Sequence, residues 1–162
     1  MSDFLPVAAY LPHRAPMLLL DRVIQVTDDS VICEVHVNAA GVLAPFLTVQ
    51  GDLPAWYGVE MMAQTVGVWS GFHARQRGDD EIRPGMLLGG RGYRASSAAF
   101  AVNSTLRIEM RLLMRDDRLG SFEGEIRSDD AIIASGRLNT YQPNEQELIQ
   151  LQHVPLKQGV QP

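Results

Sequence analysis

The chain has 162 residues, 46% of them hydrophobic, which is enough for one domain with a sizeable core. Its formal net charge of -5 and the lack of a basic run give no reason to expect nucleic acid as a partner, and its single cysteine excludes an internal disulfide framework. No stretch is apolar over the roughly 18 residues that a membrane span needs, and the first residues lack the basic flank of a signal peptide, so we expect a cytoplasmic protein with no membrane contact.

The N-terminal part of the chain predicts a helical turn followed by a β-hairpin. The turn is expected over residues 4–10, and the two prolines at 12 and 16 then favour an extended backbone. A strand is predicted over 17–26 and another over 31–37, where apolar and polar residues alternate. The Asp-Asp-Ser sequence at 28–30 is typical of a tight turn, so the two strands should pair.

A long helix is predicted next, after a loop over 38–52. It should run from Ala55 to about Arg77, with Pro54 in its first turn, where a missing N–H is tolerated. Asp52 just ahead of it is a candidate N-cap. Because the segment is apolar around most of its circumference, we expect the helix to be buried.

Two polar side chains interrupt this apolar helix. Glu60 and Gln64 lie one turn apart and therefore on the same face. A carboxyl group in the wall of a buried helix is unfavourable unless it is paired or protonated. This acid is the first indication of chemistry in the sequence.

Beyond the helix the sequence predicts antiparallel strands. Residues 86–99 should be an extended strand made irregular or bulged by three glycines. Three further strands are predicted near 106–112, 122–126 and 132–138, separated by short turns, and these form a meander. A single sheet must wrap the one helix to bury it, so the fold class is α+β with one domain over 1–142. Residues 143–162 are expected to be a polar tail with a helical turn near 146–152.

Two motifs resemble those of the 3-hydroxyacyl-acyl-carrier-protein dehydratases. Leu11–Val23 (Leu-Pro-His-Arg-Ala-Pro-Met-Leu-Leu-Leu-Asp-Arg-Val) is similar to the opening of that family, and Glu60–Gln64 (Glu-Met-Met-Ala-Gln) is similar to its Glu-x-x-Ala-Gln on the central helix. The motifs keep the order and rough separation of the family, and the resemblance covers about Leu11 to Tyr141. It implies the hot-dog fold, in which a curled antiparallel sheet surrounds one helix and pairs edge to edge with a second chain.

The sequence departs from this family at one position. Those dehydratases carry a histidine in a Gly-His-Phe-Pro-Gly loop fourteen residues before the helix glutamate, and Phe46 occupies that offset here. The chain resembles a divergent branch of dehydratase-like proteins encoded with aryl-polyene pigment pathways, which share Leu-Pro-Ala-Trp ahead of Gly-x-Glu and a later Leu-Leu-Gly run. This resemblance implies a phosphopantetheine-linked substrate on acyl carrier protein and no further cofactor.

The dehydration of a 3-hydroxyacyl thioester needs an acid, a base and donors for the thioester oxygen. Glu60 suits the acid, since a carboxyl group in an apolar pocket keeps its proton more readily; alternatively it pairs with Arg14 or Arg91 at a dimer contact. His13 is the nearest candidate for the missing base, and the alternative is a structural histidine bonded to a backbone carbonyl. The other three histidines are expected to be surface, interface or tail residues.

The candidate substrate-binding residues are Gln64, Ala55, Trp56, Gly58, Gly89 and Gly90. Gln64 would orient the Glu60 carboxyl group or pack at a dimer contact. Backbone N–H groups over 55–58, at the positive end of the helix, would polarise a thioester carbonyl. The glycines at 89 and 90 would let an acyl chain pass close to the backbone or would form a bulge. No His/Cys cluster has the spacing of a metal site.

Three functional hypotheses follow from these residues and the resemblance. The first is a 3-hydroxyacyl-acyl-carrier-protein dehydratase of fatty-acid or polyene biosynthesis, acting as a homodimer or as a heterodimer with a hot-dog paralogue. The second is a non-catalytic acyl-binding subunit of such a heterodimer, favoured by the missing loop histidine. The third is an acyl thioesterase in which Glu60 activates water.

Overall fold

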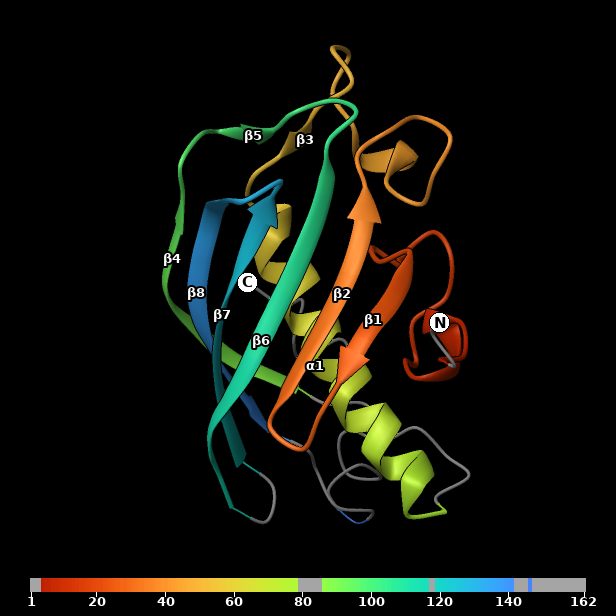
Figure 1. The fold of residues 1–162 in the computed structure, drawn as a ribbon, viewed down its shortest axis with the longest axis vertical. Coiled ribbons are helices and arrows are strands. Elements are labelled where there is room, and N and C mark those ends of the chain that lie inside the picture. Colours follow the sequence, from red (N-terminus) through yellow and green to blue (C-terminus); the bar gives the residue numbers. More distant parts are fainter. Residues whose placement is uncertain (1–3, 79–85, 117–118, 142–145, 147–162) are drawn as a thin grey trace, which may run out of the picture.

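A single helix packed against one curled antiparallel sheet makes up the protein, in a computed structural model that describes residues 4–78, 86–116, 119–141 and 146 (Figure 1). The helix is α1 (Tyr57–Gln76), and the six strands follow the order β1-β2-β6-β7-β8-β4. Their bounds are β1 Arg22–Val26, β2 Ser30–His36, β4 Met86–Ala95, β6 Thr105–Arg115, β7 Leu119–Ser128 and β8 Ala131–Tyr141. The short strands β3 (Leu53–Pro54) and β5 (Ala99–Phe100) form a separate pair, and 3-10 turns lie at η1 (Val7–Ala9) and η2 (Ala44–Phe46).

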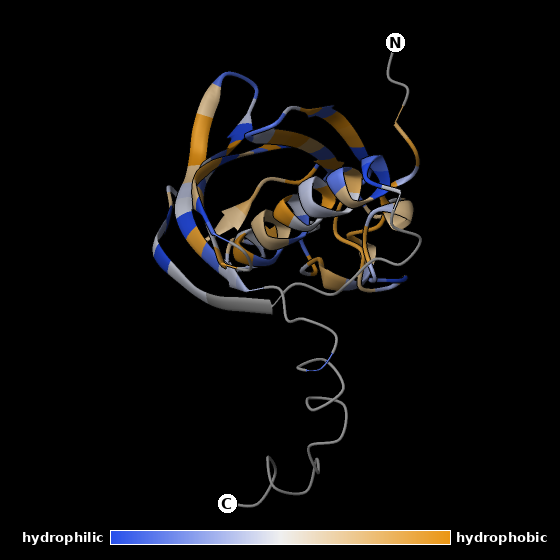
Figure 2. Cartoon of the chain, turned by 90° about the horizontal axis from the view of Figure 1, so that it is seen from below, coloured by the Kyte–Doolittle hydropathy of each residue, from blue (hydrophilic) through white to orange (hydrophobic). Residues whose placement is uncertain are grey.

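The sheet curls around the helix, as the end-on view in Figure 2 shows. Apolar side chains of β2, β6 and β7 alternate with polar ones, so that one face of the sheet packs on α1 and the other carries charge. The helix contributes fully buried side chains such as Met61, Met62 and Val68. The α+β hot-dog architecture implied by the sequence is thus confirmed.

The only cysteine, Cys33, belongs to this core. It lies on the inner face of β2 with no exposed surface. Burial raises the pKa of its thiol to about 12, and the hydrogen bond with Thr65 offsets only part of that increase. The thiol therefore stays protonated and unreactive at neutral pH.

The predicted hairpin is confirmed, but its first strand is shorter than expected. β1 begins at Arg22; the N–H of Asp21 still donates to the carbonyl of Glu34 in β2 (2.9 Å), but the residues before Asp21 pair with no strand in the described part of the chain. The backbone N–H of Leu19 instead donates to Gln64 Oε1 (2.9 Å), and the carbonyl of Met17 accepts from Gln64 Nε2 (2.8 Å). A helix side chain therefore takes the backbone groups that a longer strand would have paired, which alternation of residues alone does not reveal.

The start of the helix also differs from the prediction. Pro54 lies in β3, opposite Ala99, and α1 begins at Tyr57, so placing Pro54 in the first helical turn was wrong. Asp52 is not the N-cap either, because no side chain caps the helix. Its carboxylate accepts a hydrogen bond from the Thr48 hydroxyl and closes the loop ahead of β3.

The strands after the helix follow the predicted meander, with β6, β7 and β8 paired in sequence. The predicted irregularity of the glycine-rich strand is also confirmed, because the pairing of β4 with β8 shifts register between Leu87 and Gly89 and again between Arg91 and Arg94. Gly92, at the second shift, has a φ of 60°, a left-handed conformation that favours glycine.

Two expectations concern segments at the limits of the described chain. The predicted tail over 143–162, with its helical turn, lies outside the described residues except for residue 146. In the described part of the chain, no helix is both long enough and apolar enough to cross a membrane.

Candidate active site

The two sequence motifs meet at one carboxyl group. Glu60, in the first turn of α1, places its Oε2 atom 3.6 Å from Nε2 of His13 and 3.1 Å from Nε2 of Gln64. His13 precedes the sheet by several residues and Gln64 lies one helical turn beyond Glu60. A single chain therefore brings together the acid and the base candidate that were predicted from separate stretches of sequence.

Gln64 holds the cluster in place. Its side chain is buried, with 1% of its surface exposed, and its amide makes three hydrogen bonds. The oxygen accepts from Leu19 N–H, while the nitrogen donates to the carbonyl of Met17 and to the Glu60 carboxylate. Because a buried amide with satisfied partners has little freedom to rotate, Gln64 fixes both the Glu60 carboxyl group and the segment that follows His13.

The His13 ring has one nitrogen facing Glu60 and one without a partner. Its Nδ1 atom is buried and makes no hydrogen bond within the described part of the chain. The structure therefore shows no backbone carbonyl bonded to this ring, which was the structural alternative for His13. Because no hydrogen bond at Nδ1 fixes the tautomer of the ring, Nε2 can face Glu60 either as a donor or as an acceptor.

Arg14 does not form the ion pair with Glu60 that was considered from sequence. Its guanidinium donates to the backbone carbonyls of Leu11 (2.9 Å), His13 (2.7 Å) and Ala8 (3.3 Å). These bonds tie the extended segment to the turn before it. Arg14 therefore supports the backbone on which His13 sits and does not pair with the carboxyl group of Glu60.

The cluster is less sheltered than the sequence suggested. In the single chain the Glu60 side chain is 42% exposed and that of His13 34% exposed. A helix apolar around most of its circumference predicts deeper burial, but the fully buried side of α1 is the one that carries Met61 and Met62. The carboxyl group is thus open to a substrate and, in one chain alone, to water.

The start of α1 offers backbone donors, but fewer than predicted. The N–H of Ala55 donates to the carbonyl of Ala98 (2.9 Å), and that of Gly58 donates to the carbonyl of Ala55 (3.0 Å). Trp56 and Tyr57 follow with N–H groups that have no acceptor in the described part of the chain, and no side chain caps the helix. The two free donors therefore belong to Trp56 and Tyr57.

Tyr93 fixes this helix start, and sequence reasoning missed it. The bulge at Gly92 turns Tyr93 of β4 inward, where its hydroxyl donates to the carbonyl of Ala55 (2.6 Å) and burial raises its pKa to about 12. A side chain at Gly58 would collide with this hydroxyl. Gly58 therefore has a packing role beneath Tyr93. The signal for this in the sequence was a tyrosine directly after the Gly-Gly-Arg-Gly stretch at 89–92.

Phe46, at the offset of the family's loop histidine, packs against an aromatic side chain of the helix. It lies in η2, with its ring centroid 5.2 Å from that of Tyr57, and the ring centroid of Trp56 lies 5.9 Å from that of Tyr57. The Trp56 residue is 69% exposed. Phe46 supplies no ionisable group, so His13 is the histidine that faces Glu60.

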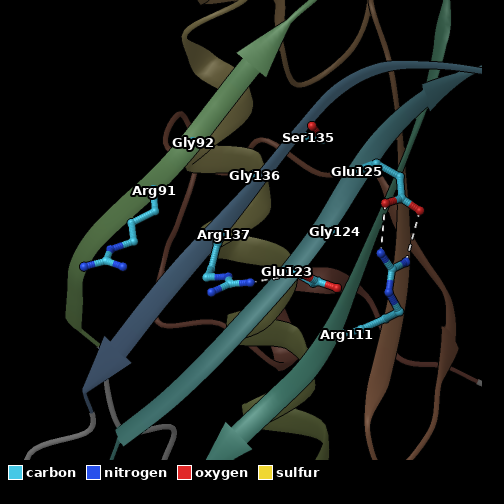
Figure 3. A pocket seen from close by; sticks show the side chains of 9 residues that line it. All are labelled: Arg91, Gly92, Arg111, Glu123, Gly124, Glu125, Ser135, Gly136 and Arg137. Atoms are coloured by element: carbon cyan, nitrogen blue, oxygen red, sulfur yellow. Dashed lines mark hydrogen bonds and ion pairs between the residues drawn. The ribbon is translucent and has the colours of Figure 1, made fainter.

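The other two predicted substrate contacts lie on the edge strand of the sheet. Gly89 pairs with Asn139 and Gly90 with Leu138, next to the bulge in β4. The following Arg91 lines a hollow of about 430 Å³ on the outer face of the sheet (Figure 3). The predicted bulge is thus present, and Arg91 does not pair with Glu60.

Two further histidines have structural contacts. Nε2 of His73 lies 3.0 Å from the carbonyl of Thr27, which also accepts a hydrogen bond from Trp69, so His73 joins the helix to the hairpin turn. His36 is exposed and bonds with Thr105. The described residues contain no group of three His, Cys, Asp or Glu side chains that would hold a metal ion.

Comparison with known proteins places these features in a family. Residues 5–151 match the ApeP-like family, described as ApeP dehydratase. The chain belongs to the ApeP-like dehydratase family. A chain of the dehydratase heterocomplex ApeI:P from Xenorhabdus doucetiae is 53% identical to this ApeP-like chain, with a TM-score of 0.88 over 93% of this chain and 99% of that one.

More distant relatives carry the name 3-hydroxyacyl-[acyl-carrier-protein] dehydratase FabZ. The Shewanella oneidensis protein is 27% identical to the ApeP-like chain over 141 residues, which is 84% of this chain and 89% of the relative. The Streptococcus pyogenes protein is 40% identical over 72 residues, so that this match spans about half (49%) of the relative. A hypothetical thioesterase from Streptococcus pneumoniae, at 11% identity and a TM-score of 0.57, shows the shared fold alone.

Proposed function

We propose that this ApeP-like protein dehydrates a 3-hydroxyacyl thioester on acyl carrier protein to the 2-enoyl thioester, in fatty-acid or polyene-type biosynthesis. The observation that carries the proposal is the Glu60 carboxyl group, 3.6 Å from the His13 ring and held by Gln64. The family match and the names of the FabZ relatives support the same reaction class.

The reaction removes water from adjacent carbons. A base takes the proton on C2, the electron pair of that C–H bond forms the C2=C3 double bond, and the C3–O bond breaks as an acid protonates the departing hydroxyl. Glu60 in its protonated form supplies that proton, and His13 or a water held by it takes the proton on C2. Gln64 keeps the carboxyl group oriented toward His13 throughout, since its other hydrogen bonds fix it to the backbone.

The free N–H groups of Trp56 and Tyr57 would bind the thioester oxygen. They lie at the positive end of α1, a few residues before Glu60. Removal of the C2 proton makes the thioester an enolate, whose oxygen gains negative charge and is stabilised by such donors. The substrate arrives on the phosphopantetheine arm of the carrier protein, and the reaction requires no further cofactor.

A second hot-dog chain would complete the site. Because Glu60 and His13 are more than a third exposed in one chain, water has access to both. Pairing through a sheet edge, in a homodimer or in a heterodimer with a hot-dog paralogue, would cover the cluster and exclude water. The heterocomplex that contains the similar Xenorhabdus chain supports this kind of assembly.

One observation favours a second candidate function. Phe46 replaces the histidine that the resembling dehydratases carry before the helix, so the chain would act as an acyl-binding subunit while a paralogue supplies the chemistry. In that case Glu60 and His13 would position the substrate without exchanging protons with it.

The test measures the product and assigns it to a chain. Purified protein, alone and mixed with the ApeI chain of the Xenorhabdus complex, is given a 3-hydroxyacyl carrier protein, and the loss of water is followed by mass spectrometry. We expect the enoyl product and its loss in Glu60→Gln. A Glu60→Gln complex with the full rate would assign catalysis to the partner, and release of free thiol instead would indicate a thioesterase.

A further inference from the structure

The sheet ends in two edge strands, and the longer one is β4. β4 has ten residues and β1 has five, and each pairs with only one neighbour in the sheet. Figure 1 shows β4 along the outer left side of the sheet, next to β8. A long edge strand presents unpaired backbone N–H and C=O groups, which makes it the natural place for a strand of another chain to add.

This edge carries only positive charge. Arg91 and Arg94 of β4 are exposed, and although their backbones pair with β8, neither guanidinium group makes a hydrogen bond or ion pair within the described part of the chain. Arg91 lies directly opposite Arg137 of β8, and like charges in a cross-strand pair are unfavourable. Neither β4 nor β8 contains an acidic residue, although the chain as a whole has a net charge of -5.

The outer-face glutamates are committed to arginines farther from the edge. Glu123 lies 3.5 Å from Arg137, and Glu125 accepts two hydrogen bonds from Arg111. Figure 3 shows the Arg137 side chain directed toward Glu123, whereas the Arg91 side chain, at the rim of the hollow, extends away from Arg137 toward the free side of β4. The guanidinium group of Arg91 is therefore accessible to a chain that pairs with β4.

We propose that this cationic edge, Arg91 and Arg94 of β4, selects a hot-dog partner with an acidic pairing edge over a second copy of the same chain. In an antiparallel pair of two identical β4 strands, the two-fold symmetry would bring the positive charges of both strands to one interface without any acidic residue of β4 to balance them. A partner with carboxylates at that edge would form charge-assisted contacts instead, and like-charge contacts act against the wrong partner. The inference rests on the pairing described under the proposed function and names the partner's chemistry.

The experiment compares self-association with mixed association. Sedimentation velocity is run on the wild-type chain, on an Arg91→Glu/Arg94→Glu variant, and on their mixture, with Arg127→Glu on the interior strand β7 as the matched charge-change control. We expect the mixture to associate at least about tenfold more tightly than either chain alone, because only the mixture joins opposite charges. The control mixed with wild type should behave as wild type does alone.

Salt provides a second readout. Between about 50 mM and about 500 mM salt, screening should weaken the mixed pair and strengthen the self-association of wild type.

The ApeI chain is the natural partner probe, and its binding should fall at least about tenfold for the double variant. A wild-type chain that self-associates as tightly as the mixture, with no dependence on salt, would overturn the inference. Glu60→Gln should leave all these associations unchanged, so failure of the catalytic proposal remains distinguishable.

Discussion

Two glutamates, Glu34 on the sheet and Glu60 on the helix, have neighbours that suit the same side chain to different roles. Glu34, on the outer face of β2, is 7% exposed and lies between Arg22 and Arg107 at 2.9 and 3.3 Å. Burial raises its pKa, but the hydrogen bonds and charges of the two arginines outweigh that effect, so the pKa is lower than usual. Glu60, on the helix, has a histidine and an amide as neighbours and, among the described residues, no arginine.

The difference lies in what each neighbour allows. A permanent guanidinium charge holds a carboxyl group in its ionised form, which suits a structural ion pair and excludes a role as proton donor. A histidine changes its charge near neutral pH, and an amide binds either form of the acid. Glu34 is therefore committed to a structural ion pair, whereas the described neighbours of Glu60 carry no permanent charge.

The largest effect is expected when an arginine is placed next to Glu60, because this makes its surroundings resemble those of Glu34. His13→Arg would hold the carboxyl group ionised, as Arg22 and Arg107 hold Glu34, and we expect the dehydration rate at neutral pH to fall by about 100-fold. His13→Gln, which keeps a hydrogen-bonding side chain without a charge, should lose about tenfold if His13 is the base. Steady-state rates across pH 5–9 would separate the two; equal rates for both variants and wild type would contradict the proposed roles.

The next largest effect concerns Gln64. Gln64→Met keeps the volume but leaves Leu19 N–H and the Met17 carbonyl without their buried partner, so we expect a loss of about 2–3 kcal/mol in the free energy of unfolding. The rate should also fall, since the carboxyl group of Glu60 loses its fixed orientation. Urea denaturation measures the first effect and product formation the second. Gln64→Glu, with one oxygen in place of the donor, tests whether the N–H toward Met17 is the essential contact.

The smallest effect should come from the ion-paired glutamate. Because the pKa of Glu34 is lowered in the folded state, its stabilising contribution is present above the unfolded pKa, near 4.5, and is lost as the pH falls through the folded value. Glu34→Gln should therefore cost about 1–2 kcal/mol at pH 7, less at pH 3, and leave the dehydration rate unchanged. Denaturation curves at the two pH values check this, and an equal cost at both would argue against the ion-pair explanation.

Much of the fold could be predicted from the sequence, because it depends on patterns of residue type. The alternation around Cys33 and the run of apolar residues around Met61 predict which faces are buried, and the structure agrees. The beginning of the first strand could not be predicted in this way. It depends on Gln64, 45 residues from Leu19 along the chain, reaching the backbone that precedes β1.

Part of the site was also predictable from patterns of residue type, and the rest depends on contacts between distant parts of the chain. Glu60 and Gln64 stand out because polar residues in an apolar helix are unusual, and His13 stands out through the family motif. Tyr93 and the free N–H groups at Trp56 and Tyr57 depend on where the helix begins, which Pro54 in β3 moves by a few residues. Residue types near a helix end predict its first residue poorly when the same residues can also form a strand. Here Leu53 and Pro54 pair with β5 instead of joining the helix.

The inert thiol in the core has a practical consequence for spectroscopy. Since Cys33 has no exposed surface and remains protonated at neutral pH, maleimide reagents will not modify it in the folded protein. A cysteine introduced on the surface would then be the single labelling position, without any change to the native one. Fluorophores placed this way along β4 would report the arrival of a second chain directly.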